Sequence, residues 1–443
     1  LFFICLGPEQ QGATDVGLYE AWMNDAKTNG VWPVRDLTNW VYPAAAVLPM
    51  IWAKLGHDLT HFSFMVSWLS LITVFNALAC LAMWLMAGRR RALLGIAAWI
   101  VFLALLGPTA LSRVDSAAAP LIVIGLAAIP VAIPLATSLL TLGAWVKVAP
   151  GAVVLPLLMG TRRSVLRVVV PGLAVCLAVL GVAVAFGCKP SAVLGFFGRQ
   201  AGRGLQLESV AATPFVISRA RQHIEIAQFN NDLGTYETQS AQANGVAGLL
   251  DLVLVALAVA IALLVLRARL RGAWQLVHGK TKPLGSWRAR FQAVRQDQHG
   301  KATPHNQREV LMVAALAALT AMIVANKVGS PQFVAWIGPP MALGLALWPT
   351  RRWWQVVGAG VGVIAVLTHL IYPTIYMSLL SGQANAVAVL AVRNAGLVIL
   401  LLACLFKLWN LGTAGGSPDC DHTDDAAAPD AASVRLAAPA DAR

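Results

Sequence analysis

The stretch HFSFMVSWLSLITVFNALACLAMWLMAGRRRALLGIAAWIVFLALL, residues 61–106, decides the fold class of this chain. Two long apolar runs flank the basic turn GRRR (88–91). Because about 20 apolar residues in a helix cross the hydrocarbon core of a bilayer, each run predicts one membrane span. The three arginines between the runs predict a cytoplasmic turn, since Lys and Arg gather in the loops that stay inside.

The same pattern continues along the 443 residues, of which 58% are hydrophobic and 12% charged. Further apolar runs lie at 116–149, 164–186, 246–266, 310–325, 333–348, 353–372 and 386–409. The pattern is typical of an all-α polytopic membrane protein, and we expect a bundle of roughly ten to thirteen transmembrane helices. The piece 116–160 must cross an odd net number of times, either as one bent span or as three short helices broken at Pro130, Pro134 and Pro150.

Basic loops set the expected orientation of these spans. They are 88–91, 160–167, 350–354 and the long segment 267–308, which carries ten Lys and Arg against one acid, Asp297. A net charge of +13 would suit a nucleic-acid partner, but the basic residues lie in turns between apolar runs, which follows the positive-inside rule. We therefore expect a plasma-membrane protein with these loops in the cytoplasm and no nucleic-acid partner.

The orientation predicts one transmembrane domain, 1–410, followed by a disordered cytoplasmic tail, 411–443, rich in Ala, Asp and Pro. Residues 1–7 are interpreted as the end of a first span. The segments predicted to lie outside are 8–60, 112–116, 187–245, 326–332 and 372–385. Because most unusual polar and aromatic residues fall in these segments, we expect a structured first outer loop and a functional site on the extracytoplasmic face.

Asp15 lies in the stretch GATDVGLYEAW (12–22), at the start of the first outer loop. Thr14 is suited to cap a helix over 14–28. Three side chains of that helix would share one face: Leu18, Trp22 and Ala26. A carboxylate in a first turn stabilises the helix N-terminus without any chemical role, and this is the plain structural explanation of Asp15.

A series of motifs in a fixed order gives Asp15 a second explanation. The motifs are DVGLY (15–19), VYPAAAVLPM (41–50), SRVDSAAAPLIVIGLA (112–127), AWVKVAPGAVVLPLLMGTRR (144–163), GRGLQLESVAATP (202–214) and NKVGSPQFVAW (326–336). In their order and spacing the chain resembles the GT-C membrane glycosyltransferases, in particular the actinobacterial polyprenol-phosphate-mannose-dependent mannosyltransferases. The resemblance covers about residues 12 to 340, and beyond about 350 only the hydropathy agrees.

The resemblance implies a GT-C fold and an activity in cell-envelope biosynthesis. Such enzymes move a hexose, here mannose, from a polyprenyl-phosphate donor to a hydroxyl of a glycolipid or polysaccharide acceptor on the extracytoplasmic side. We expect transfer with inversion, and arabinofuranose is the competing sugar. In the family an Asp of the first outer loop is the general base, which by position is Asp15.

Transfer needs a base for the acceptor hydroxyl and cations for the departing phosphate. Asp36, beside Arg35, and Asp115 are the rival outer acids. The candidates for binding the donor phosphate are Arg199, Arg203, Lys327 and His223. The candidates for binding the sugar or the acceptor are Tyr19, Tyr42, Asp115, Gln206, Glu208 and Gln332.

Several candidates have structural explanations as well. Lys327 ends a span, where its ammonium group can reach the membrane interface, and Glu208 can pair with Arg203. For Tyr372 and Tyr376 we favour an interfacial aromatic belt over sugar stacking. Lys147 is an ionisable group inside an apolar run, and its depth depends on how 116–160 crosses.

Absent motifs narrow the function further. The sequence has no HExxH, no paired acids of the DxD type in the outer loops and no nucleotide-binding glycine loop, so we expect neither a metal nor a cofactor. The acids of an ion-driven transporter are missing from mid-span, since Asp251 lies near the start of its run. A flippase for lipid-linked sugars and a non-catalytic scaffold of envelope assembly stay as alternatives to the enzyme.

Overall fold

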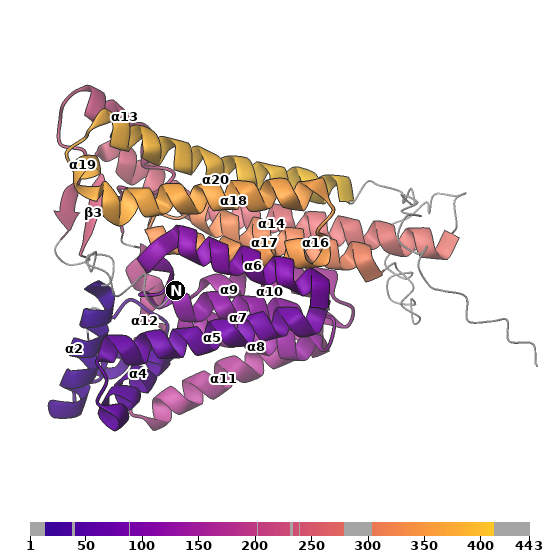
Figure 1. Cartoon of the computed structure of the whole chain (residues 1–443), viewed down its shortest axis with the longest axis horizontal. Coiled ribbons are helices and arrows are strands. Elements are labelled where there is room, and N and C mark those ends of the chain that lie inside the picture. The colour runs from indigo at the N-terminus through magenta and orange to yellow at the C-terminus, as the bar shows by residue number, and fades with distance from the viewer. Residues whose placement is uncertain are drawn as a thin grey trace, which may run out of the picture.

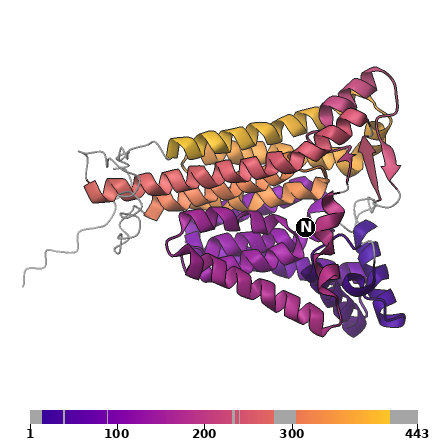
Figure 2. The same ribbon diagram turned by 180° about the vertical axis from the view of Figure 1, so that it is seen from behind.

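The computed structural model describes residues 14–37, 40–87, 89–201, 203–230, 234–238, 240–278 and 304–411. The helices run along one long axis, and a small antiparallel sheet lies at one end of the bundle together with α2 (Thr14–Thr28) and α4 (Val47–Thr60) (Figure 1). The view from behind shows the same arrangement (Figure 2). We call this end of the bundle the α2 end.

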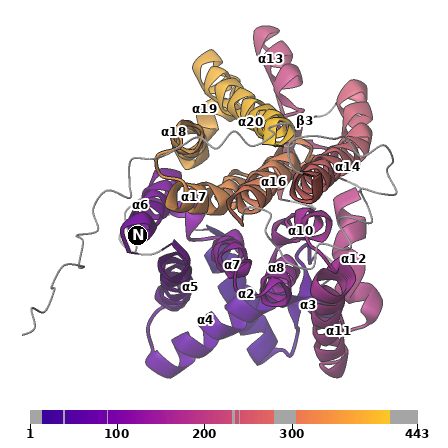
Figure 3. The ribbon, with the colours of Figure 1, turned by 90° about the vertical axis from the view of Figure 1, so that its right-hand side faces the viewer.

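Seven helices of the described chain are long and apolar enough to cross a membrane, which makes it a multi-pass membrane protein. They are α5 (Phe64–Ala87), α6 (Arg89–Leu106), α11 (Val170–Ala185), α14 (Ala241–His278), α16 (Pro304–Val324), α18 (Arg352–His369) and α20 (Ala384–Leu411). Most of α16 is buried, whereas α11 has no buried residue and lies at the edge of the bundle in the end-on view (Figure 3).

Residues 115–160 form three short helical segments, Asp115–Ala128, Ile133–Val146 and Ala149–Gly160, and not one bent helix. α7 (Asp115–Ala128) packs against α8 (Ile133–Val146), and α9 (Ala149–Ala152) leads into α10 (Val154–Gly160). Pro134 and Pro150 stand in the first turns of α8 and α9, where a missing N–H breaks no hydrogen bond. Lys147 is extended between these two helices, so it lies at the α2 end and not within a helix.

The segment from α2 to α4 also contains α3 (Pro33–Asp36) and η2 (Ala44–Ala46). α2 begins and ends where the sequence predicts. Its buried stripe consists of Val16, Tyr19, Met23 and Ala26. Leu18 and Trp22, which share a face with Ala26, line a cavity, and Trp22 also packs against the edge of the core.

The sheet belongs to the segment between α11 and α14. This segment contains α12 (Pro190–Ala201), β1 (Leu205–Gln206), α13 (Thr213–Arg221), β2 (Gln228–Asn230) and β3 (Thr235–Thr238). The strand order is β1-β3-β2, all antiparallel, with Gln206 opposite Glu237. Buried Leu205, Val216 and Ile226 belong to the same apolar cluster as Leu390 of α20, which fixes the sheet to the bundle.

The C-terminal half adds three shorter elements between the long helices. η6 (Pro331–Ile337) and α17 (Gly338–Leu347) follow α16, and both are largely buried. η7 (Leu370–Thr374) and α19 (Tyr376–Leu380) connect α18 to α20 at the α2 end (Figure 1).

The opposite end of the bundle carries the arginine-rich turns and a buried acid. Glu309 of α16 is completely buried, forms an ion pair with Arg351 and lies 3.5 Å from the ammonium group of Lys407. This contact joins three helices, because Arg351 precedes α18 and Lys407 belongs to α20.

Replacing Arg351 with alanine is expected to lower the free energy of unfolding by about 1–3 kcal/mol, because it leaves a buried carboxylate short of donors. The half-exposed Arg351 side chain keeps the loss in the lower part of that range. Thermal unfolding in detergent measures the loss. The double variant Arg351→Ala with Glu309→Gln is expected to be more stable than Arg351→Ala alone, and a further drop in Tm would contradict this account.

Candidate active site

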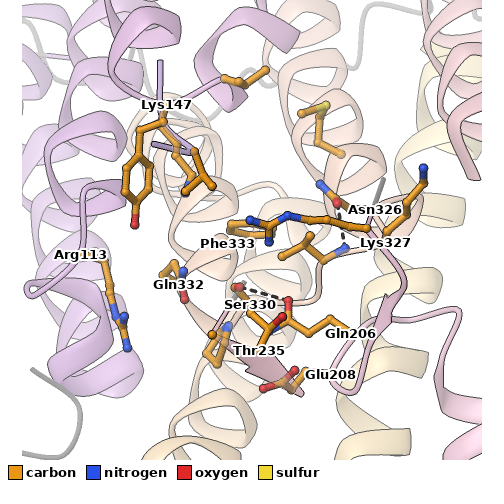
Figure 4. A pocket seen from close by; sticks show the side chains of 18 of the residues that line it. Arg113, Lys147, Gln206, Glu208, Thr235, Asn326, Lys327, Ser330, Gln332 and Phe333 are labelled. Carbon is orange, nitrogen blue, oxygen red and sulfur yellow. Dashed lines mark hydrogen bonds between the residues drawn. The ribbon is translucent and has the colours of Figure 1, made fainter. Parts of the chain in front are cut away.

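A cavity of about 740 Å³ lies at the α2 end of the bundle. Residues far apart in the sequence line it, among them Asp15, Leu18, Trp22, Tyr42, Arg113, Lys147, Arg203, Gln206, Glu208, Tyr236, Asp251, Lys327, Gln332, Tyr372 and Tyr376. Figure 4 shows Arg113 and Lys147 on one side and Gln206, Glu208 and Lys327 on the other. Asp15 and Lys327 are more than 300 residues apart in the sequence, and together with Arg203 they line one cavity.

Asp15 stands in the first turn of α2 and forms an ion pair with Arg113. The Arg113 guanidinium is nearly buried, and its Nη2 also donates to the hydroxyl of Tyr372 at 3.2 Å. Burial alone would lower the pKa of Arg113, but the neighbouring Asp15 carboxylate outweighs it and the pKa is raised. Arg113 therefore stays charged, and it holds the Asp15 carboxylate in the cavity wall.

Tyr19 and Tyr42 pack behind Asp15. Tyr19 is fully buried, its hydroxyl accepts the backbone N–H of Val114 at 3.3 Å, and its ring lies 5.2 Å from that of Trp68. Tyr42 lines the cavity. Burial raises the pKa of both phenols, so both hydroxyls keep their protons at neutral pH. Tyr19 therefore supports the wall, while Tyr42 is in a position to contact a ligand.

Asp115 lies beneath the cavity wall and is almost inaccessible. Its carboxylate accepts from the indole N–H of Trp336 at 2.7 Å and pairs with the ammonium group of Lys147 at 3.2 Å. Lys147 lines the cavity, and its ammonium group lies 5.1 Å from the ring centroids of both Tyr42 and Phe333. Asp115 thus orients a cavity cation, and the sequence-based assignment of Asp115 to sugar or acceptor binding stays a prediction.

Arg203 and Gln206 lie on the segment that leads into the sheet. Arg203 is half-buried, and within the described chain its buried Nε has no hydrogen-bond partner. Burial lowers the pKa of Arg203 while Glu237 opposes this shift. A guanidinium with a buried, unsatisfied N–H favours an anion from outside the chain.

Gln206 connects this segment to the 326–332 turn. Its backbone N–H donates to the carbonyl of Lys327 at 2.9 Å. Its side-chain oxygen accepts from Gly329 N–H at 3.2 Å and from the hydroxyl of Ser330 at 3.3 Å (Figure 4). Gln206 therefore acts as a structural clamp, in addition to lining the cavity.

Gly329 allows these two segments to touch. A Cβ at this position would lie 2.1 Å from the backbone nitrogen of Ser209 and 2.3 Å from the carbonyl carbon of Glu208. Gly329→Ala is expected to separate the segments and to destabilise the protein by about 1–3 kcal/mol. Thermal unfolding in detergent tests this, with Gly360→Ala as the control because nothing lies within 4 Å of a Cβ there. Equal Tm values for the two variants would contradict the close contact.

Lys327 and Gln332 line the cavity from the turn after α16. The Lys327 ammonium group lies 2.9 Å from the carboxylate of Asp251 on α14. Lys327 itself is largely buried, whereas the side chain of Asp251 is 66% exposed. Lys327 is thus held by a carboxylate at the rim of the cavity. A lysine that only extended to the membrane interface would not need this partner.

Glu208 is a second buried carboxylate of the cavity wall. Burial raises its pKa, while a hydrogen bond with the Tyr376 side chain and the charge of Arg393 act in the opposite direction. The amide of Asn394 donates to the carbonyl of Ser209 at 3.2 Å and to the Thr213 hydroxyl at 2.7 Å. α20 therefore fixes the turn that presents Glu208.

Two candidates lie elsewhere. Arg199 belongs to α12, and its side chain is outside the described part of the structure. His223 is exposed, has a positive φ of 54° and is not among the residues that line the cavity. Tyr372 and Tyr376, for which the sequence favours an aromatic belt, both line the cavity and contact its charged groups, and the belt stays a prediction.

Sequence reasoning did not assign Arg113 any role. A signal was present in the sequence, because Arg113 and Asp115 lie in one short turn between two spans. Charged side chains in such a turn are close to any site at that end of the bundle. The described residues contain no group of three or more His, Cys, Asp or Glu side chains that could hold a metal. Comparison with protein families, with curated proteins and with solved structures gave no match.

Proposed function

We propose that this chain is a membrane glycosyltransferase of the GT-C type with roughly ten to thirteen spans. It moves a hexose, for which the sequence resemblance favours mannose, from a polyprenyl-phosphate donor to a hydroxyl of a glycolipid or polysaccharide. The reaction takes place on the extracytoplasmic face of the plasma membrane and needs no metal or cofactor.

One observation carries the proposal: Asp15 and Arg203 line the same cavity, together with Lys147 and Lys327. A carboxylate that can accept a proton and several cations that can bind a phosphate are the two requirements of the reaction. The polar residues Gln206, Ser330 and Gln332 also line the cavity, and they can form hydrogen bonds with sugar hydroxyls (Figure 4).

In the proposed reaction the acceptor oxygen attacks the anomeric carbon of the donor sugar. The bond from that carbon to the phosphate oxygen breaks, and the lipid phosphate leaves with the electron pair. Asp15 accepts the hydroxyl proton, while Arg203 and Lys327 bind the phosphate as its charge grows. Attack from the side opposite the phosphate inverts the anomeric centre.

A flippase would use the same groups to bind a lipid-linked sugar without transferring it, and an arabinofuranosyltransferase would differ only in the sugar. A panel of radiolabelled polyprenyl-phosphate hexoses and pentoses, each incubated with the purified protein and glycolipid acceptors, separates these possibilities. A labelled glycolipid supports the transferase and names the sugar. Movement of the donor across proteoliposome membranes without any product would favour the flippase.

A further inference from the structure

Tyr372 and Tyr376 lie on the connection between α18 and α20, and both line the cavity. The backbone at Tyr372 leaves the helical conformation, with φ −132° and ψ 121°. The two rings meet edge to face with centroids 5.3 Å apart. The hydroxyl groups of the pair point to two different parts of the cavity wall, since one contacts Arg113 and the other contacts Glu208.

The first contact leads to Asp15. Arg113 donates to the Tyr372 hydroxyl at 3.2 Å and pairs with the Asp15 carboxylate through its other terminal nitrogen. The Arg113 side chain is about 10% exposed, so solvent does little to orient it. Tyr372 therefore fixes the guanidinium, which in turn fixes the carboxylate.

The second contact leads to Glu208. Its carboxylate is buried and hydrogen-bonds to the side chain of Tyr376. Arg393 of α20 is almost completely buried nearby and supplies a favourable charge. Within the described chain, Nε and Nη2 of Arg393 have no hydrogen-bond partner, and neither does Oε2 of Glu208. Tyr376 and Gln206 are therefore the polar side chains that restrain this carboxylate on the cavity side.

We propose that Tyr372 and Tyr376 are positioning residues that hold the Asp15 and Glu208 carboxylates in fixed positions relative to each other. Tyr372 orients Asp15 through Arg113, and Tyr376 orients Glu208 toward the sugar. This inference deepens the proposed function and rests on it. The two roles differ, because an oriented base changes the rate of the chemical step whereas an oriented sugar ligand changes substrate binding.

Phenylalanine substitutions test the two roles with the loss of a single oxygen each. Tyr372→Phe is expected to lower kcat roughly tenfold with little change in KM, because it removes one hydrogen bond to a charged group. Tyr376→Phe is expected to raise the KM of the sugar donor by a similar factor while kcat changes little. The control is Thr374→Val, which removes a hydroxyl of the same segment that bonds to the carbonyl of His369. Loss of kcat and KM in the same proportion in both tyrosine variants would overturn the assignment.

Coupling to Arg113 tests the route by which Tyr372 acts. In an Arg113→Lys background, Tyr372→Phe is expected to lower kcat no further, because lysine cannot bridge the hydroxyl and the carboxylate as a guanidinium does. A full additional tenfold loss would mean that Tyr372 acts without Arg113.

A measurement that needs no turnover separates failure of this inference from failure of the proposed function. The Tm changes of Asp15→Asn and Tyr372→Phe are expected to be non-additive in the double variant, since both residues share Arg113. Additive changes would refute the linkage even in an active enzyme. Non-additive changes in a protein that transfers no sugar would uphold the linkage and refute the proposed function alone.

Discussion

Asp15→Asn is expected to reduce sugar transfer by about 10²–10⁴-fold, because the amide cannot accept the proton of the acceptor hydroxyl. The substitution keeps the size and shape of the side chain, so the cavity remains intact. It also leaves the nearly buried Arg113 with a neutral partner, and we therefore expect a lower Tm as well. Turnover is measured with radiolabelled donor at a temperature well below the Tm of the variant, with gel filtration to verify folding.

Asp36→Asn is the matched control for this experiment. Asp36 belongs to the same segment and pairs with Arg35 at 2.9 Å, but it is partly exposed and does not line the cavity. Transfer by this variant is expected to equal that of the wild type. Near wild-type transfer by Asp15→Asn would exclude Asp15 as the base. The buried Asp115 would be a poor replacement, because Lys147 and Trp336 already occupy its carboxylate.

The seven long apolar helices were predictable from the sequence because each one is a local signal, whereas the apolar run 333–348 forms two shorter elements, η6 and α17. An apolar run of sufficient length can adopt few structures in a bilayer, since every backbone N–H must find a hydrogen-bond partner within the chain. The limits of α2 were predictable for the same reason, as Thr14 and the residues that follow form a local helix signal. The division of 115–160 into separate helices was not predictable, because proline marks the breaks without saying whether a helix bends or ends there.

For the cavity, the sequence predicts only which single residues are chemically suited to a site, and not which of them contact one another. Asp15 and Arg203 stand out as charged residues in segments expected at one face. The bridge from Arg113 to Tyr372 spans 259 residues and depends on the packing of α18 beside α6, which no local pattern encodes. The cavity contacts of Tyr372 and Tyr376 were not predictable, because an aromatic side chain at the end of a span has the same sequence signature whether it faces lipid or a cavity.

Arg203→Gln is expected to raise the KM for the polyprenyl-phosphate donor by roughly 10- to 150-fold, which corresponds to the loss of a charged hydrogen bond worth about 1.5–3 kcal/mol. The Nε of Arg203 has no partner in the described chain, so a phosphate oxygen would satisfy a group that is otherwise buried and unpaired. The KM for the acceptor is expected to stay within about twofold of wild type, because the substitution leaves the wall around Asp15 unchanged.

Two features make this result diagnostic. Arg221→Gln removes an exposed arginine of α13 that does not line the cavity, and it is expected to leave both KM values unchanged. Arg203 also interacts with the charge of Glu237 of β3, so a purely structural role predicts a lower Tm and equal losses for both substrates. A rise in donor KM alone therefore assigns the guanidinium to the phosphate. Proportional losses would reassign it to the sheet and leave Lys147 and Lys327 as the phosphate-binding cations.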